Sequence, residues 1–129
     1  MKKSMLTGSF FLSAFLFFSV SLTNGAQADS TAAQKAQGDY MGQCSPCHGE
    51  QGDGKGPLAE SLGKAPRNHT DSKYMSARTD EQLIKVVTDG GAVSGFDEGM
   101  PPFSTILSNE EIKGVVAYVR QLCKCKYTK

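Results

Sequence analysis

Cys44, Cys47 and His48 are the residues of this 129-residue chain whose types and spacing point most clearly to chemistry. They lie in the run Cys-Ser-Pro-Cys-His. Two thiols three positions apart can add across the two vinyl groups of a haem, and the histidine that follows can then bind the iron from one face. A C-x-x-C-H run is typical of covalent haem c attachment. The sequence therefore predicts one covalently attached haem c, with His48 as an iron ligand.

A second iron ligand is expected from the segment 99–103, Gly-Met-Pro-Pro-Phe. The prolines push the methionine before them out of the helical conformation and stiffen the chain, which suits a side chain that must point at one atom. We therefore predict Met100, whose thioether favours ferrous iron and raises the reduction potential. Met75, His69 and an open position are the alternatives, and an open position would indicate a haem enzyme or a gas sensor. Met41 precedes the attachment site on the same expected helix and would share its side of the haem.

The four cysteines of the chain allow two other functions to compete with haem attachment. Cys44 and Cys47 also resemble a thioredoxin-like dithiol, but that chemistry usually occurs on a βαβ scaffold and no strand pattern is present. All four could bind a structural zinc ion, although the Cys-Lys-Cys spacing at 123–125 is tight for such a site. In an oxidising compartment we expect Cys123 and Cys125 to form a disulfide, either with each other or between two chains, with free thiols as the alternative.

An all-α fold is predicted, because no stretch of the chain alternates as a strand does. The first helix is expected from about Thr31 to Cys44, with an apolar stripe. The glycine-rich segment 49–57 reads as a loop. A short helix is expected over residues 58–62.

Two capping boxes predict where the later helices begin. Thr79-Asp-Glu-Gln82 opens a helix expected to run through Val87 and to end at Gly90-Gly91. Ser108-Asn-Glu-Glu111 opens the longest helix of the domain. Apolar residues recur in that helix at helical spacing: Ile112, Val115, Val116, Val119 and Leu122.

Residues 1–28 have the pattern of an export signal. Two lysines precede an uncharged apolar stretch over residues 5–22, and the small-x-small pattern at 26–28 predicts cleavage before Asp29. An uncleaved anchor is the alternative, because a spanning helix needs about 20 apolar residues and a signal core about 7–15. The expected mature unit is one periplasmic domain, residues 29–129, with membrane contact only if the signal segment is retained.

The charges of the expected mature domain are nearly balanced. Removal of the two N-terminal lysines would leave twelve basic residues against thirteen acidic ones. No block of like charge occurs, so no nucleic-acid partner is expected.

The motifs of residues 29–129 resemble, in type and in order, those of the class I c-type cytochromes. The resemblance rests on Cys-x-x-Cys-His-Gly at 44–49, Gly-x-Gly-x-Gly-Pro at 52–57, Gly-Met-Pro-Pro-Phe at 99–103 and Val-Ala-Tyr-Val-Arg at 116–120. It implies a cytochrome c-like fold of three to five helices around one covalently bound haem. It also implies a one-electron carrier rather than an enzyme, with no small-molecule substrate. The implied partners are redox proteins: an oxidase, a reductase or a dehydrogenase.

The same resemblance implies roles for particular residues. The carbonyl of Pro57 would accept the proton on the second nitrogen of the ligand histidine, which would fix the orientation of the ring. Ala36, Tyr40 and Tyr118 match the positions at which the first and last helices of the family cross. Arg67 lies in a loop that would approach the haem propionates.

An electron carrier also needs an exposed face on which a partner can dock. The residues expected on that face are an apolar patch of Pro101, Pro102 and Phe103 and a rim of lysines: Lys55, Lys64, Lys73 and Lys85.

Overall fold

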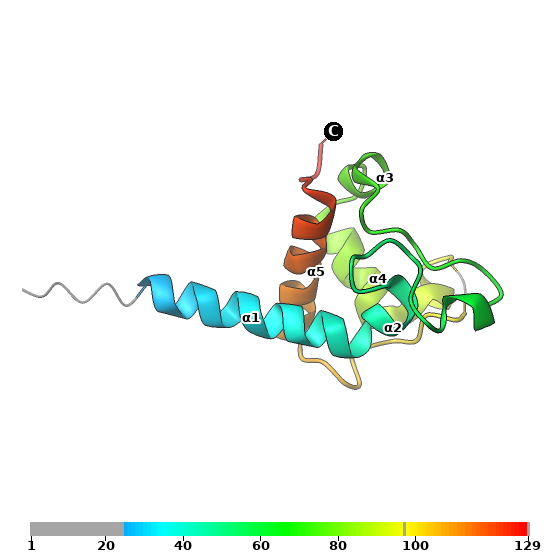
Figure 1. Ribbon diagram of the computed structural model, residues 1–129, viewed down its shortest axis with the longest axis horizontal. Coiled ribbons are helices and arrows are strands. Elements are labelled where there is room, and N and C mark those ends of the chain that lie inside the picture. Colours follow the sequence, from blue (N-terminus) through cyan, green and yellow to red (C-terminus); the bar gives the residue numbers. More distant parts are fainter. Residues whose placement is uncertain (1–24, 97, 129) are drawn as a thin grey trace, which may run out of the picture.

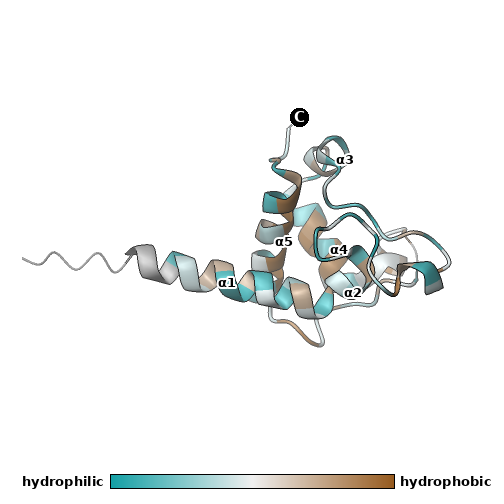
Figure 2. Ribbon diagram, in the orientation of Figure 1, coloured by the Kyte–Doolittle hydropathy of each residue, from teal (hydrophilic) through white to brown (hydrophobic). Residues whose placement is uncertain are grey.

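The computed structural model describes residues 25–96 and 98–128, with side chains from residue 29 onward. This part of the chain consists of helices and loops and contains no strand, so the predicted all-α class is confirmed for it (Figure 1). Figure 2 shows hydrophobic residues concentrated on α4 and α5 and many hydrophilic residues along α1. The elements are α1 (Gly25–Gln43), α2 (Ser45–His48), the 3-10 turn η1 (Ala59–Ser61), α3 (Ser72–Ser76), α4 (Asp80–Val93) and α5 (Asn109–Cys123).

Helices α1 and α5 cross through a small-residue contact and an aromatic pair. A Cβ atom placed on Gly114 of α5 would lie 3.3 Å from the Cβ of Ala36 on α1, so the two backbones approach closely there. One turn further along α1, the ring centroids of Tyr40 and Tyr118 lie 5.1 Å apart, and Tyr40 is fully buried. Ala36, Tyr40 and Tyr118 therefore lie at the crossing, as the resemblance implied. Gly114, which permits the close approach, was not singled out from the sequence.

Gly114→Val is expected to destabilise the haem-loaded protein by about 1–3 kcal/mol, because the new side chain would force α5 away from Ala36. Thermal unfolding measures the effect. Gly38→Ala is the matched control, since nothing lies within 4 Å of its Cβ position. That change within α1 should stabilise the protein by about 0.5–1 kcal/mol. If Gly114→Val is as stable as the wild-type protein, the crossing of α1 and α5 is not tight.

Both predicted capping boxes are present. The backbone N–H of Thr79 donates to the side chain of Gln82 at 2.9 Å, and the N–H of Gln82 donates back to the Thr79 hydroxyl at 3.2 Å. Ser108 and Glu111 form the same reciprocal pair at 2.8 and 3.4 Å. Each pair satisfies N–H groups that have no partner within the helix, so α4 and α5 begin where the sequence predicted.

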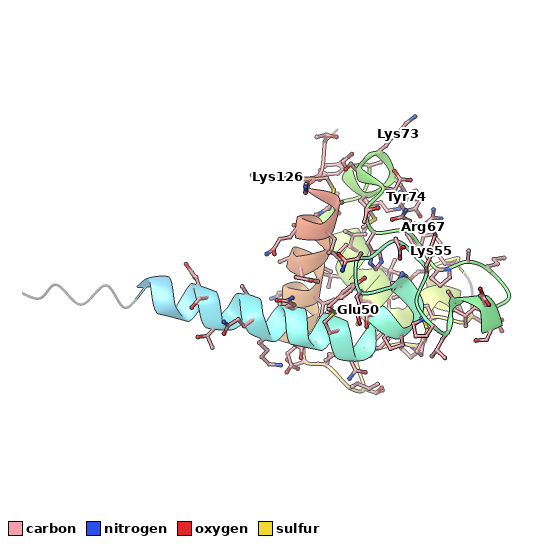
Figure 3. All side chains as sticks on the ribbon, in the orientation of Figure 1. Glu50, Lys55, Arg67, Lys73, Tyr74 and Lys126 are labelled. Carbon is pink, nitrogen blue, oxygen red and sulfur yellow. A yellow bond between two sulfur atoms is a disulfide. The ribbon has the colours of Figure 1, made fainter. Side chains whose placement is uncertain are left out.

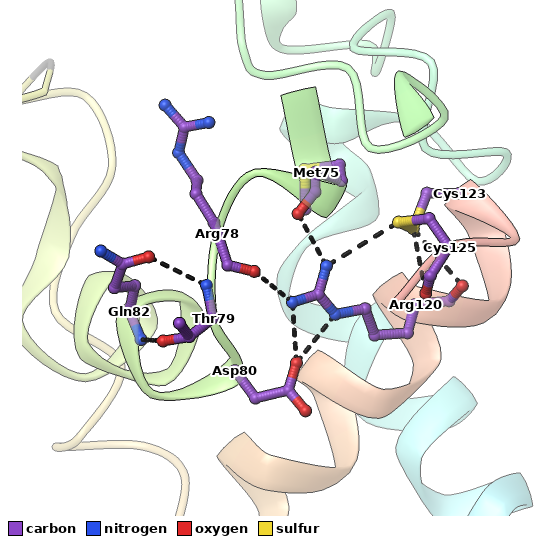
Figure 4. Close-up of polar contacts among 8 residues, drawn as sticks. All are labelled: Met75, Arg78, Thr79, Asp80, Gln82, Arg120, Cys123 and Cys125. Atoms are coloured by element: carbon purple, nitrogen blue, oxygen red, sulfur yellow. Dashed lines mark hydrogen bonds and ion pairs between the residues drawn. A yellow bond between two sulfur atoms is a disulfide. The ribbon is translucent and has the colours of Figure 1, made fainter. Parts of the chain in front are cut away.

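Arg120 of α5 joins α3 to the start of α4 (Figure 4). Its guanidinium donates to the carbonyl oxygens of Met75 at 2.7 Å and Arg78 at 2.6 Å, and to the carboxylate of Asp80 at 2.8 Å. The two carbonyls belong to the end of α3 and the turn after it. The short helix α3 was not predicted, and it is held in place by an arginine more than 40 positions away in the chain.

Cys123 and Cys125 form a disulfide with each other, which confirms the expected disulfide in its intrachain form. Cys44 and Cys47 are the free cysteines of the described residues. The hydroxyl of Ser72 donates to the carbonyl of Cys123 at 2.6 Å. The end of α5 is therefore attached to α3 as well as closed by the disulfide.

Helix α1 begins at Gly25 rather than near residue 31, because nothing in the intervening alanine-containing segment interrupts a helix. Its N-terminal half is exposed over residues 29–35, so the buried stripe is shorter than expected. Residues 1–24, most of the predicted signal segment, lie outside the described residues, and cleavage before Asp29 stays a prediction. Within residues 25–96 and 98–128, no helix has both the length and the apolar character needed to cross a membrane.

Candidate haem-binding site

A cavity of about 320 Å³ lies between α2, α3, α4 and α5 and the loops that connect them. Its volume falls within the range of small-molecule and cofactor sites, about 300–1,000 Å³. The motif residues Cys44, Cys47, His48 and Met100 all line it. Much of the remaining wall is apolar, and its leucine and valine residues are Leu62, Leu83, Val86, Val87, Val115, Val116 and Val119.

Hydrogen bonds that continue α1 into α2 hold the attachment residues. The N–H of Cys44 donates to the carbonyl of Tyr40 at 2.8 Å, and the N–H of His48 donates to the carbonyl of Cys44 at 2.9 Å. Cys44 is buried and Cys47 is half-buried. One helical turn thus places two free thiols and an imidazole on the wall of a single cavity, as covalent haem attachment requires.

The glycine-rich loop folds back along α2 and satisfies its last carbonyls. The N–H of Gly54 donates to the carbonyl of His48 at 2.7 Å, and the N–H of Gly56 donates to the carbonyl of Cys47 at 3.0 Å. A Cβ on Gly56 would collide with the carbonyl oxygen of Pro46. Glycine is needed at position 56 because the loop backbone lies directly against the attachment turn.

The Nδ1 atom of His48 lies 2.8 Å from the carbonyl oxygen of Arg67. A carbonyl can only accept, so Nδ1 carries the proton and the lone pair of Nε2 is free to bind a metal. The predicted partner, the carbonyl of Pro57, is therefore wrong for this bond. The chain passes through η1 beyond Pro57 and returns, and the N–H of His69 then donates to Gly52 at 2.6 Å. This return brings the Arg67 carbonyl to the imidazole.

The ionisation of the attachment residues does not suit dithiol chemistry. Burial, together with the nearby Cys47, raises the pKa of the Cys44 thiol to about 12. Redox-active dithiols depend instead on a lowered thiol pKa, so the thioredoxin-like alternative loses its support. Burial also lowers the pKa of His48, although the bond to Arg67 opposes this. Burial thus favours the neutral imidazole, the form that binds metals.

A structural zinc site built from all four cysteines does not form. Two of them, Cys123 and Cys125, are joined in the disulfide. In the part of the chain that the structure describes, no three His, Cys, Asp or Glu side chains are grouped so that they could hold a metal ion.

Backbone contacts with the end of α4 hold the segment that carries Met100. The N–H of Gly91 donates to the carbonyl of Met100 at 2.8 Å, and the N–H of Phe103 donates to Val87 at 3.0 Å. Gly90 has a φ of +82°, and a Cβ there would lie 2.9 Å from the Met100 carbonyl oxygen. The sequence predicted that this helix ends at Gly90-Gly91. In the structure the backbone turns at Gly90 inside α4, and the segment that carries Met100 packs against this turn.

The alternative ligands lie in different places around the cavity. Met75 lines it from α3 and is almost fully buried, at 2% exposure. The ring of His69 stacks on the ring of His48, with centroids 4.1 Å apart and planes 16° from parallel, so His69 lies against the predicted first ligand. Burial, followed by the charges of His48 and Arg67, lowers the pKa of His69 to about 3. Met41 packs against the core and does not line the cavity.

Two arginines flank one tyrosine at the edge of the cavity. The guanidinium carbons of Arg67 and Arg78 lie 3.8 and 3.4 Å from the centroid of the Tyr74 ring. All three side chains line the cavity, and Figure 3 shows Arg67 and Tyr74 together on one side of the domain. Guanidinium groups bind carboxylates well, so this pair suits the propionates of a haem. Arg78 was not singled out from the sequence, because nothing local marks its approach to Tyr74.

One residue of the expected docking face lies in the core. Phe103 is only 8% exposed, whereas Pro101 and Pro102 are exposed. Of the expected lysine rim, Lys85 is paired with Asp89 at 2.5 Å. Three other large apolar residues are well exposed in the described chain on either side of the Met100 segment: Val93 (72%), Phe96 (46%) and Ile106 (58%).

Comparison with known proteins agrees with this geometry. A family model described as "Cytochrome C oxidase, cbb3-type, subunit III" matches residues 31–119. The chain belongs to this family. It is a class I c-type cytochrome, as its motifs predicted, and its cofactor is covalently bound haem c.

Individual relatives support the same conclusion at the level of sequence and fold. The chain is 31% identical, over 79% of its length, to "Cbb3-type cytochrome c oxidase subunit FixP" of Azorhizobium caulinodans, and spans 31% of that relative. The solved "KustC0563 c-type cytochrome" is 30% identical, with a TM-score of 0.55 over 67% of this chain and 95% of that one. The "Kuenenia stuttgartiensis reducing HAO-like protein complex Kustc0457/Kustc0458" gives 26% identity and a TM-score of 0.57 over 69% of this chain and 41% of that one. These likenesses confirm the cytochrome c-like helical fold.

Proposed function

We propose that this cytochrome is an exported, soluble mono-haem carrier that passes single electrons between redox partner proteins, with iron held by His48 and Met100. The observation that best supports this is the convergence of Cys44, Cys47, His48 and Met100 on one largely apolar cavity. A carrier needs no general base and no substrate pocket. It needs an iron site whose ligands stay in place in both oxidation states.

Two residues would hold the iron in place, His48 from one side and Met100 from the other. Haem c supplies a one-electron ferric–ferrous couple when bound. His48 would bind iron through Nε2, while the Arg67 carbonyl keeps the proton on Nδ1. Met100 would offer a thioether, which favours the ferrous state, from a segment whose backbone contacts Gly90 and Gly91. Ligands held in this way would move little when the charge on the iron changes.

The other walls of the cavity would stabilise the bound cofactor. Arg67 and Arg78 would compensate the charge of the propionates from either face of Tyr74. The aliphatic side chains of α4 and α5 would exclude water from the rest of the site.

We propose that the partners are redox proteins of the periplasm, reached after removal of residues 1–28. The curated relative is named as a subunit of a cbb3-type oxidase, so an oxidase complex is the first candidate, with a reductase or a dehydrogenase as alternatives. Docking would use the exposed apolar residues around Pro101 and Pro102: Val93, Phe96 and Ile106.

The test uses the haem-loaded protein isolated from the periplasmic fraction. We expect an intact mass equal to residues 29–129 plus one haem, and a redox titration with a single one-electron step. The reduced protein should not bind carbon monoxide readily, because the second axial position is filled. Ready binding would contradict the carrier and favour a haem enzyme or a gas sensor. A mass that retains residues 1–28 would contradict cleavage and indicate an anchored cytochrome.

A further inference from the structure

His69 occupies the space between the proposed iron ligand and the buried end of α1. Its ring stacks on that of His48, with centroids 4.1 Å apart and an angle of 16° between the planes. Its Nδ1 atom lies 3.2 Å from the hydroxyl oxygen of Tyr40, which is 0% exposed. No other described aromatic ring stacks on His48. The side chain therefore links the iron site to the helix crossing.

The hydrogen bonds around Tyr40 determine where the His69 proton lies. The Tyr40 hydroxyl has one proton and donates it to the carbonyl of Gly49 at 3.1 Å. Its oxygen is then left as the acceptor for His69, so the proton of His69 is on Nδ1. The ring of His69 is thus held by a directed bond at one edge while its face lies against His48.

The backbone leaves His69 little room to withdraw. Its N–H donates to the carbonyl of Gly52 at 2.6 Å. A Cβ at Gly52 would lie 3.1 Å from the Cβ of His69, which shows how closely these two loop segments approach each other. The carbonyl of Arg67, two residues earlier, bonds the edge of the His48 ring at 2.8 Å. One short segment therefore contacts the ligand imidazole at both its edge and its face.

We propose that His69 is a positioning residue that, by stacking, sets the plane of the His48 ring at the iron; this rests on the proposed ligation by His48. An imidazole bound through Nε2 can rotate about its bond to iron, and its plane selects the iron d orbital with which it interacts. The Arg67 carbonyl holds the ring at one point, Nδ1. The hydrogen bond at Nδ1 limits rotation of the ring, and a flat neighbour pressed against the face restricts both tilt and rotation further.

Two variants separate the ring of His69 from its hydrogen bond. His69→Phe keeps a flat ring but loses the donor to Tyr40. His69→Asn keeps a donor near the Nδ1 position but loses the ring. The readout is the proton NMR spectrum of the ferric holoprotein, in which the order and spread of the haem-methyl resonances report the plane of the axial imidazole.

We expect His69→Asn to reorder the haem-methyl resonances and His69→Phe to retain the wild-type order with a lower Tm. An unchanged order in His69→Asn would overturn the proposal. Equal reordering in both variants would also overturn it, because loss of the hydrogen bond would then be the cause. If His69→Asn does not load haem, His69→Leu takes its place, since leucine fills space without a flat face.

A measurement on the wild-type protein distinguishes failure of the proposed function from failure of the positioning role of His69. Near-infrared magnetic circular dichroism of the ferric wild-type protein identifies the axial pair. A pair without histidine would refute the ligation by His48. A histidine–methionine pair with no spectral response in His69→Asn would refute the positioning role and leave the proposed function intact.

Discussion

Met100→Ala is expected to leave the haem attached through Cys44 and Cys47 while opening the second axial position of the iron. The reduced variant should bind carbon monoxide, which the wild type should not. Its reduction potential should fall by a substantial part of the range of about 0.8 V that axial ligands span, because the thioether preference for ferrous iron is lost. Absorbance spectra with and without carbon monoxide, and a redox titration, measure both effects.

Met75→Ala is the matched control for this prediction, because Met75 lines the same cavity and is the alternative sulfur ligand. Truncation of a side chain that is 2% exposed should cost about 2–5 kcal/mol of stability. It should leave the potential and the resistance to carbon monoxide unchanged. If Met75→Ala opens the iron and Met100→Ala does not, the ligand is Met75.

Gly90→Ala tests the placement of the Met100 segment without removing its sulfur. The added Cβ would lie 2.8–3.0 Å from backbone atoms of residues 100–102, at a φ of +82° that alanine disfavours. The segment should therefore shift, and the spectrum should move toward that of Met100→Ala.

His48→Ala is expected to have the larger effect, a nearly complete loss of haem-loaded protein. Removal of an outer partner of a ligating histidine typically costs about 10–100-fold in metal affinity, so the loss of the ligand itself should exceed this range. Haem staining of denatured protein from the periplasmic fraction, set against total protein, measures the loading.

His69→Phe is the control for that loss, because it changes the other histidine of the cavity and keeps an aromatic ring in place. Its haem loading should stay close to that of the wild type. A low-spin, fully loaded His48→Ala protein would contradict the proposed ligation by His48.

Features carried by residues close together in the chain could be predicted from the sequence. The attachment motif needs two thiols and an imidazole within five positions, and one helical turn places all three on the cavity wall. The capping boxes at Thr79 and Ser108 depend on hydrogen bonds over three residues, so the starts of α4 and α5 were correct. The pairing of Cys123 with Cys125 likewise needs only a short turn.

Contacts between distant segments were mostly missed. Arg67 accepts the proton of His48 through a backbone carbonyl, a group that every residue has, so no side chain marked it and the choice of Pro57 was wrong. Phe103 looked like part of an exposed patch because of its neighbouring prolines. The bond from its N–H to Val87 instead places it in the core.

The chemistry of the site therefore follows from the sequence, whereas the surroundings of each ligand depend on the path of the chain. Residue types within one turn determine that a haem can be attached, and the Gly-Met-Pro-Pro-Phe segment at 99–103 shows that a methionine is available. The return of the loop at residues 66–69 decides which carbonyl and which ring meet His48. Hydrogen bonds act over about 3 Å and ring pairs over centroid distances of a few ångströms, and only folding brings groups some 20 positions apart within those ranges.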